Sequence, residues 1–156
     1  TESHLDLTMM LYQISEEFYP ALCAKELTLE THIEAGLRYK GDADKLARVF
    51  DNLLRNAISY SHPGTPVILS ALQNETQIRI AVRNSGDKIP PQKLKRLFEK
   101  FYRADPSRGS TNGGAGLGLA IAKQLVELHQ GTIDVVSNDQ YTEFTVLLVR
   151  NEPVQE

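Results

Sequence analysis

The sequence lacks several features that would place it in whole classes of protein. Its 156 residues include one cysteine, Cys23, so no disulfide can form within the chain, and we expect this thiol to pack as a small buried side chain. No apolar run approaches the roughly 18 residues of a membrane span, and the polar opening at Thr1 does not resemble a signal peptide. A formal net charge of -3 gives no basic surface, so we expect no nucleic-acid partner.

What the sequence does contain is typical of one soluble domain. Hydrophobic residues make up 41% of the chain and charged residues 24%, a composition that can bury a core. We expect this domain to span residues 1–150 and to be followed by a frayed polar tail at 151–156.

Hydrophobic periodicity predicts the order of the elements. Apolar residues at helical spacing predict helices over 6–25, where Pro20 kinks or ends the helix, and over 42–60, about 90–98, and 116–129. Alternating apolar residues predict strands over 27–33, 67–72, 77–84, 132–136 and 143–149. Helices interleave with strand pairs, so we expect an α/β fold: a two-layer sandwich of a mixed, largely antiparallel sheet of about five strands packed on about three helices.

A column of polar side chains interrupts the helix predicted over 42–60. Asn52, Asn56 and Tyr60 are spaced four residues apart and therefore lie along one line at the edge of the apolar stripe. Asparagine is a mediocre helix former. An amide oxygen can ligate Mg²⁺ while the metal holds phosphates, which would explain two asparagines beside the core. The polar boundary of an ordinary amphipathic helix would explain them as well.

A second polar residue stands where the strand pattern calls for an apolar one. Ile78, Ile80 and Val82 face one side of their predicted strand, and by the same alternation Asn84 faces that side too. A buried amide needs a partner, and its carbonyl could accept a hydrogen bond from an exocyclic amine such as that of adenine. A turn-capping asparagine is the other interpretation.

Glycines and aromatic residues surround the irregular stretch 102–116. The run Gly113-Gly114-Ala115-Gly116-Leu117-Gly118-Leu119 leads into a helix, whose free N–H groups can cradle phosphate. It is neither a dinucleotide fingerprint nor a Walker loop. A flexible linker is also possible, although the leucines argue against it. Before the stretch, Phe98 and Phe101 have helical spacing, and Arg103 could reach a phosphate or simply be solvated.

Taken together and in this order, these signals resemble the catalytic domain of sensor histidine kinases, in the wider family with gyrase, mismatch-repair and heat-shock chaperone ATPases. Residues 44–57 look like the family's N box, 84–90 like its G1 box, 98–103 like its F box and 114–119 like its G2 box. More narrowly, Leu5-Asp6-Leu7, Phe18-Tyr19-Pro20 and the run 113–123 are similar to glycopeptide-resistance (VanS-type) sensor kinases.

The resemblance implies a role for each matching residue. Asn56 would ligate Mg²⁺, Asn52 would lie on the phosphate side, Tyr60 would flank the nucleotide and Arg103 would touch phosphate. Asn84 would read the adenine amine. The remaining ATP-binding residues would be Gly86, Ile89, Phe101, Gly114, Gly116, Leu117, Gly118 and Leu119, the glycines forming the cradle and hinge of a mobile ATP lid over 102–116.

Three positions depart from the family pattern. Asn84 stands where the family usually has aspartate, which replaces a charged acceptor by a neutral one. Lys88 replaces a glycine of the G1 box, which implies a different turn. Ser59 stands where many relatives have a lysine that helps to bind phosphate. We expect its loss to weaken ATP affinity or to transfer the role to Arg103 or Arg108.

The implied activity is transfer of the ATP γ-phosphoryl group to a histidine in two-component signal transduction. His4, His32, His62 and His129 all lack the family's acceptor setting, so we expect the acceptor on a dimerisation domain upstream of Thr1. The implied partners are that domain and a response regulator. The implied setting is a cytoplasmic domain of a membrane-anchored homodimeric parent, with the isolated domain monomeric.

Two other functions remain open. The first is ATP hydrolysis on the same fold, but hydrolysing relatives carry a glutamate base where this chain has Asn52, which cannot accept a proton at neutral pH. The second is a catalytically degenerate nucleotide-binding or docking module, which the substitutions at Asn84 and Ser59 favour and the retained Asn56 and glycines disfavour.

Overall fold

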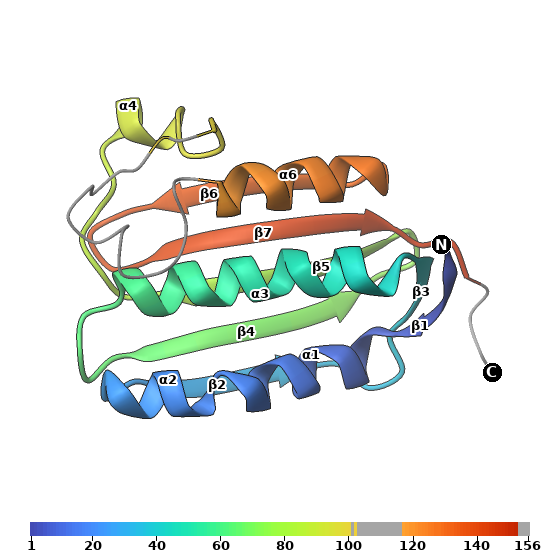
Figure 1. Cartoon of the computed structure of the whole chain (residues 1–156), viewed down its shortest axis with the longest axis horizontal. Coiled ribbons are helices and arrows are strands. Elements are labelled where there is room, and N and C mark those ends of the chain that lie inside the picture. Colours follow the sequence, from blue (N-terminus) through green and yellow to red (C-terminus); the bar gives the residue numbers. More distant parts are fainter. Residues whose placement is uncertain (101, 103–116, 153–156) are drawn as a thin grey trace.

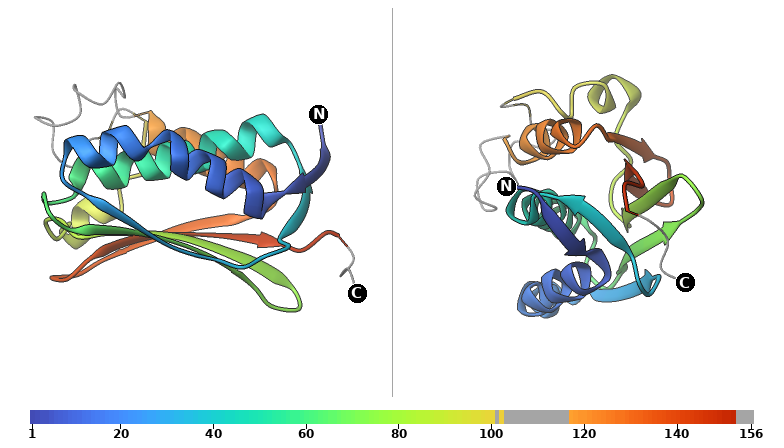
Figure 2. Two further views of the ribbon diagram at one scale, coloured as in Figure 1. Left: turned by 90° about the horizontal axis from the view of Figure 1, so that it is seen from below. Right: turned by 90° about the vertical axis from the view of Figure 1, so that its right-hand side faces the viewer.

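One twisted five-stranded sheet supports the molecule, and its helices cover one face of it (Figures 1 and 2). The computed structural model describes residues 1–100, 102 and 117–152. The strands run in the order β2-β4-β5-β7-β6. Their bounds are β2 Thr28–Ile33, β4 Pro66–Gln73, β5 Gln77–Asn84, β6 Thr132–Ser137 and β7 Thr142–Val149. Only the β2–β4 pair is parallel, so the prediction of a mixed, largely antiparallel sheet is confirmed.

The helical layer comprises α1 Leu7–Glu17, α2 Tyr19–Ala24, α3 Ala43–Tyr60 and α6 Gly118–Leu128. In Figure 1, α3 lies over the middle of the sheet, with α1 and α2 on one side of it and α6 on the other. A further short helix, α4 Pro91–Leu94, stands at the edge and is four residues long, shorter than the predicted 90–98. The two-layer α/β architecture predicted from the sequence is therefore present.

The segment predicted as one helix over 6–25 is two helices. α1 ends before Phe18, and α2 begins with Pro20 in its first turn. At that position the missing N–H of proline would have no helical partner anyway, so the proline starts a helix here rather than kinking one. Cys23, in α2, is exposed rather than buried as expected.

A separate ribbon of two short strands was not predicted. β1 Ser3–Asp6 pairs antiparallel with β3 Arg38–Gly41, and together they connect α1 to α3 at the end of the sheet opposite α4 (Figure 1). With four residues each, these strands are too short to show a reliable alternation.

The core lies between the sheet and the helical layer. Ile78, Ile80 and Val82 of β5 are at most 1% exposed, and they face the buried stripe of α3. Asp42 caps α3 by accepting a hydrogen bond from the Lys45 amide at 3.1 Å, as an N-cap aspartate does. Within the described residues, no helix has the length and apolar character needed to cross a membrane.

Candidate functional site

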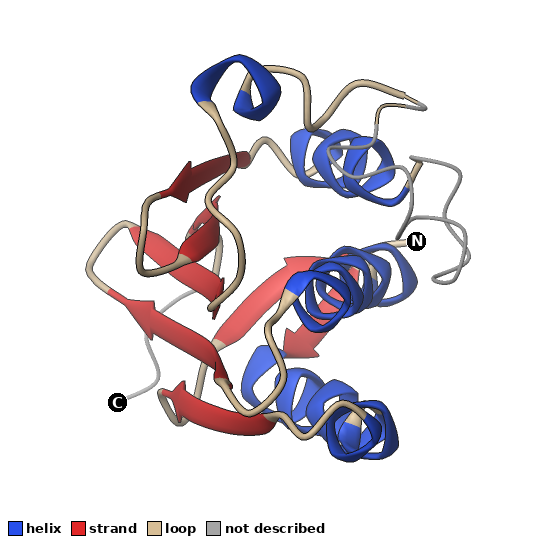
Figure 3. Ribbon diagram, turned by 90° about the vertical axis from the view of Figure 1, so that its left-hand side faces the viewer, coloured by secondary structure: helices blue, strands red, loops and turns tan. Residues whose placement is uncertain are grey.

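The predicted polar column lies on the flank of α3 that faces α6. The two helices run side by side, and Figure 3 views them from the end where α3 finishes and α6 begins. Asn52 Nδ2 donates a hydrogen bond to the carbonyl oxygen of Gly118, the first residue of α6, at 3.1 Å. This contact leaves the Asn52 amide oxygen available. Asn56 lies one turn further on and is half-buried on the same flank.

Asn84 is buried at the end of β5, as the alternation predicted. Its residue is 3% exposed and lies directly opposite Thr142 of β7. In the described part of the chain, the structure records no hydrogen bond to the Asn84 side-chain amide. Among the described residues, Arg38 Nε is the fully buried side-chain atom recorded without a partner, and the two Asn84 amide atoms are not in that class. A side-chain amide at a strand end that is open in this way is well placed to hydrogen-bond a ligand.

The turn after β5 packs closely against the end of α3. A Cβ atom added to Gly86 would lie 2.1 Å from the carbonyl oxygen of Tyr60, a separation that no side chain tolerates. The His62 amide also donates to the Ser85 carbonyl at 2.8 Å. Gly86 is therefore required so that two backbone segments can approach, and this approach brings the half-buried Tyr60 near Asn84.

Two hydroxyl residues complete this end of the site, and the sequence analysis missed both. Thr142 is 5% exposed, and its hydroxyl lies 2.7 Å from that of Ser137. Ser137 Oγ in turn accepts a hydrogen bond from the Ile89 amide at 2.9 Å. This chain of contacts holds the half-buried Ile89 segment beside Asn84. Thr142 fits the inward alternation of β7, but the predicted strand began one residue later, at Glu143.

A lysine from another helix supports the end of α3. Lys25 Nζ donates to the carbonyl oxygens of Ile58 and Ser59, at 2.8 Å and 2.6 Å. A cation at the C-terminal end of a helix is favourable because that end carries partial negative charge. Lys25 therefore binds the backbone carbonyl of Ser59. Residue 59 is the position where many relatives have a phosphate-binding lysine.

The glycine-rich run is described only from Leu117 onward. Gly118 begins α6 beside Asn52, and a Cβ added there would lie 3.8 Å from the Asn52 Cγ atom, an ordinary contact. Leu119 is partly buried against the core. The other predicted site residues in this part of the chain, Phe101, Arg103, Gly114 and Gly116, lie outside the described residues, as do Arg108 and almost all of the predicted lid.

The asparagine amide oxygens on this flank of α3 suit an Mg²⁺ ion whose other ligands are phosphate oxygens. The structure records no hydrogen bond to the Asn56 side-chain amide within the described ranges, so its oxygen is free to coordinate a cation. Those ranges also contain no cluster of three or more histidine, cysteine, aspartate or glutamate residues able to hold a metal. A metal on this flank would therefore depend on phosphate oxygens for most of its ligands.

Comparison with known proteins finds a matching family and relatives that cover most of the chain. The family model described as "Histidine kinase-, DNA gyrase B-, and HSP90-like ATPase" matches residues 41–152. The sensor protein VanS of Enterococcus faecium is 47% identical over 95% of this chain, and VanSC of Enterococcus gallinarum is 42% identical over 92% of it. The chain spans only 38% and 39% of those two proteins.

Solved structures share the fold. The mycobacterial sensor histidine kinase MprB superposes with a TM-score of 0.83 at 27% identity, covering 97% of this chain and 100% of that structure's chain. The histidine kinase ThkA, in a complex with the response regulator protein TrrA, gives a TM-score of 0.81 at 20% identity over 96% of this chain and 42% of ThkA. The chain therefore belongs to the family of histidine kinase-, DNA gyrase B- and HSP90-like ATPases, and within it to the ATP-binding catalytic domains of bacterial sensor histidine kinases.

Proposed function

We propose that this domain binds Mg-ATP between α3, the end of β5 and the start of α6, and donates the γ-phosphoryl group to a histidine on a dimerisation domain outside this chain. The observation that carries the proposal is the position of Asn84, a residue that is 3% exposed at the end of β5 and whose side-chain amide has no hydrogen bond recorded within the described residues. The base of a bound nucleotide would provide a hydrogen-bond partner for this amide. Membership of an ATPase family identifies the nucleotide as ATP.

The base end of the site recognises adenine. The Asn84 carbonyl accepts a hydrogen bond from the exocyclic amine of the base, as an amide oxygen can. Gly86 keeps the turn close to Tyr60, which flanks the nucleotide. Ile89, held by the Ser137 hydroxyl, provides an apolar wall for the ring. Recognition here depends on hydrogen bonds and shape.

The phosphate end of the site positions the reacting group. Asn56 ligates Mg²⁺ through its amide oxygen, and the metal, when bound, neutralises charge on the phosphates. Asn52 lies on the side of the site where the metal would bind, and its hydrogen bond to the Gly118 carbonyl positions the start of α6. The N-terminus of α6, with Leu117, Gly118 and Leu119, offers N–H groups to phosphate. Arg103, Phe101, Gly114 and Gly116 are proposed to complete this end of the site on sequence grounds alone.

Histidine phosphorylation is favoured over ATP hydrolysis by the residue one turn before Asn56. A hydrolase needs a base to activate water, and Asn52 is a neutral amide that already donates a hydrogen bond to Gly118. A neutral imidazole needs no such base, since its ring nitrogen already has a lone pair. Sustained phosphate release by this chain alone would contradict the kinase assignment and favour a hydrolase.

The partners and setting follow from the relatives. The parent protein is proposed to be a membrane-anchored homodimer whose catalytic domain is cytoplasmic, and its phosphohistidine is proposed to supply a response regulator. ThkA, which shares this fold, was crystallised with such a regulator. Similarity to VanS makes glycopeptide resistance the proposed pathway.

The test is a calorimetric titration of the domain with ATP, with and without Mg²⁺. We expect saturable binding that Mg²⁺ strengthens, and loss of that dependence in Asn56→Ala. The matched control is Gln13→Ala, which removes an exposed amide from another helix and is expected to leave both titrations unchanged. No binding at millimolar ATP would contradict the proposal and favour the docking-module alternative.

A further inference from the structure

An open groove between α1 and α3 lies apart from the nucleotide site. We propose that it docks an amphipathic helix of a partner protein whose apolar face is bordered by lysine and arginine. This inference does not depend on the proposed phosphotransfer.

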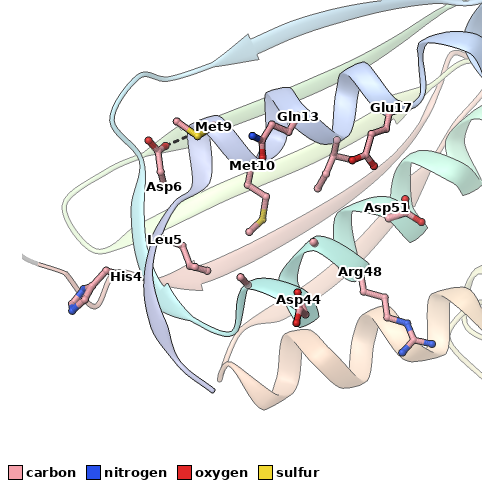
Figure 4. A pocket seen from close by; sticks show the side chains of 13 residues that line it. His4, Leu5, Asp6, Met9, Met10, Gln13, Glu17, Asp44, Arg48 and Asp51 are labelled. Atoms are coloured by element: carbon pink, nitrogen blue, oxygen red, sulfur yellow. Dashed lines mark hydrogen bonds between the residues drawn. The ribbon is translucent and has the colours of Figure 1, made fainter.

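The groove is an open hollow on the surface between the two helices. It has a volume of about 580 Å³ and runs between the two helices (Figure 4). At one end His4 and Leu5 of β1 limit it. Beyond the other end, Arg55 of α3 reaches across and lies 5.4 Å from the centre of the Phe18 ring. The 11 residues of α1 give a length of about 16 Å, which suits a few turns of a docked helix.

The floor of the groove is apolar and adaptable. Met10 projects from α1 into the space between the helices (Figure 4), and it is only partly buried. Met9 beside it is 56% exposed. Leu5 and Ile14 contribute from the same side, and the small side chains of Ala43 and Ala47 keep the α3 side low. Methionine-rich grooves accommodate helices because the side chain is flexible and polarisable.

The rim of the groove is acidic, and this negative charge determines which kind of helix can bind. The lining residues include four carboxylates, Asp6, Glu17, Asp44 and Asp51, against one arginine, Arg48. Asp51 is paired with Arg55 at 2.9 Å, and Asp6 accepts a hydrogen bond from the Met9 amide at the start of α1, so Glu17 and Asp44 are the rim carboxylates for which the described residues record no partner. A helix with basic flanks matches an apolar floor between acidic rims, whereas an acidic helix would be repelled.

The groove and the proposed nucleotide site are separated along α3 rather than around it. The groove lining on α3 runs from Ala43 to Asp51, and Asp44 and Arg48 lie on the same four-residue column as Asn52 and Asn56 but nearer the start of the helix. A docked helix therefore touches the helix that carries the proposed metal ligand without entering the site. We expect binding to the groove and binding of nucleotide to be compatible.

The test uses a fluorescently labelled synthetic helix of about 11 residues, roughly three turns, with leucines on one face and lysine and arginine on its flanks. Its anisotropy is titrated with the domain. A second peptide has the same leucines with glutamate flanks. We expect saturable binding of the basic peptide and about tenfold weaker binding of the acidic one. The double variant E17K/D44K should weaken the basic peptide about tenfold and improve the acidic one.

Three controls separate this outcome from others. Asp134→Lys makes the same change on exposed β6 and should leave both peptides unaffected. Ala47→Phe fills the floor and should abolish binding of the basic peptide, with an unchanged melting temperature as the check on folding. Saturating Mg-ATP should not displace the peptide, and this holds even if the domain proves unable to bind ATP.

The proposal is overturned if the basic peptide does not bind, if both peptides bind equally, or if E17K/D44K binds the basic peptide like the original chain. Displacement by ATP would place the peptide in the nucleotide site and would also overturn it. A dimer in solution that E17K/D44K dissociates would assign the groove to a second copy of this chain instead.

Discussion

The two ends of the proposed nucleotide site are built differently, and glycine shows the difference. At the base end, a Cβ on Gly86 would lie 2.1 Å from a backbone oxygen, so the fold itself requires glycine. At the phosphate end, a Cβ on Gly118 would lie 3.8 Å from the Asn52 side chain, which the fold tolerates. The base end is thus fixed by backbone packing. At Gly118 packing among the described residues leaves room for a side chain and does not require glycine.

Gly86→Ala is the largest expected effect and tests the comparison directly. The added methyl group must displace either the turn or the end of α3, which costs about 2–3 kcal/mol of unfolding free energy. Measured by thermal melting, this lowers the melting temperature by roughly 5–10 °C. Gly118→Ala should leave the melting temperature nearly unchanged and lower ATP affinity. Equal destabilisation by the two substitutions would contradict the comparison.

Thr142→Val comes next. The substitution keeps the shape and removes the hydroxyl that lies against Ser137, which costs about 1 kcal/mol. Since Ser137 orients the Ile89 amide, ATP affinity measured by calorimetry should also fall. Thr145→Val, on the outward face of the same strand, is the control and should leave ATP affinity unchanged. An unchanged affinity in Thr142→Val would remove this residue from the site.

Asn84→Asp should change which base the site prefers. A carboxylate accepts more strongly from the amine of adenine than a neutral amide does. It cannot donate to the keto oxygen of inosine triphosphate, whereas the amide can turn and do so. We expect the ratio of ATP to inosine triphosphate affinity to rise about tenfold in Asn84→Asp. A constant ratio would mean that residue 84 does not contact the base edge.

Ser59→Lys is the smallest expected effect. It restores a cation near the phosphates and should tighten ATP binding by about threefold at most, because exposed charge pairs contribute little. Lys25 already binds the Ser59 carbonyl and would repel the new charge. Affinity that did not change at all would show that this position is irrelevant to the phosphates.

Sequence patterns predicted the residues that depend on local periodicity. Asn84 was placed correctly on the buried face because β5 alternates without interruption, and α3 begins and ends within a residue of its prediction. The expected burial of Cys23 was wrong because it rested on residue type alone, and in α2 it is Leu22 that is buried while Cys23 is exposed. Thr142 was missed because a one-residue error at a strand end moves a residue out of the pattern.

Features that depend on tertiary contacts could not be predicted. The Lys25 cap on α3 joins residues more than 30 positions apart, and nothing in either segment indicates the other. The same is true of the groove, because α1 must first be placed beside α3. Gly86 was expected from the family resemblance to bind ATP, but the packing reason for glycine at this position, the Tyr60 carbonyl, is a contact that only the fold reveals.

The most direct test of the account is the side-chain amide resonance of Asn84, followed by NMR as ADP is added. If the base supplies the partner that the structure does not record for this amide, the Asn84 side-chain signals shift strongly and saturably, and inorganic triphosphate alone leaves them in place. If ADP binds and the Asn84 signals do not move, the base lies elsewhere and the proposed site is wrong.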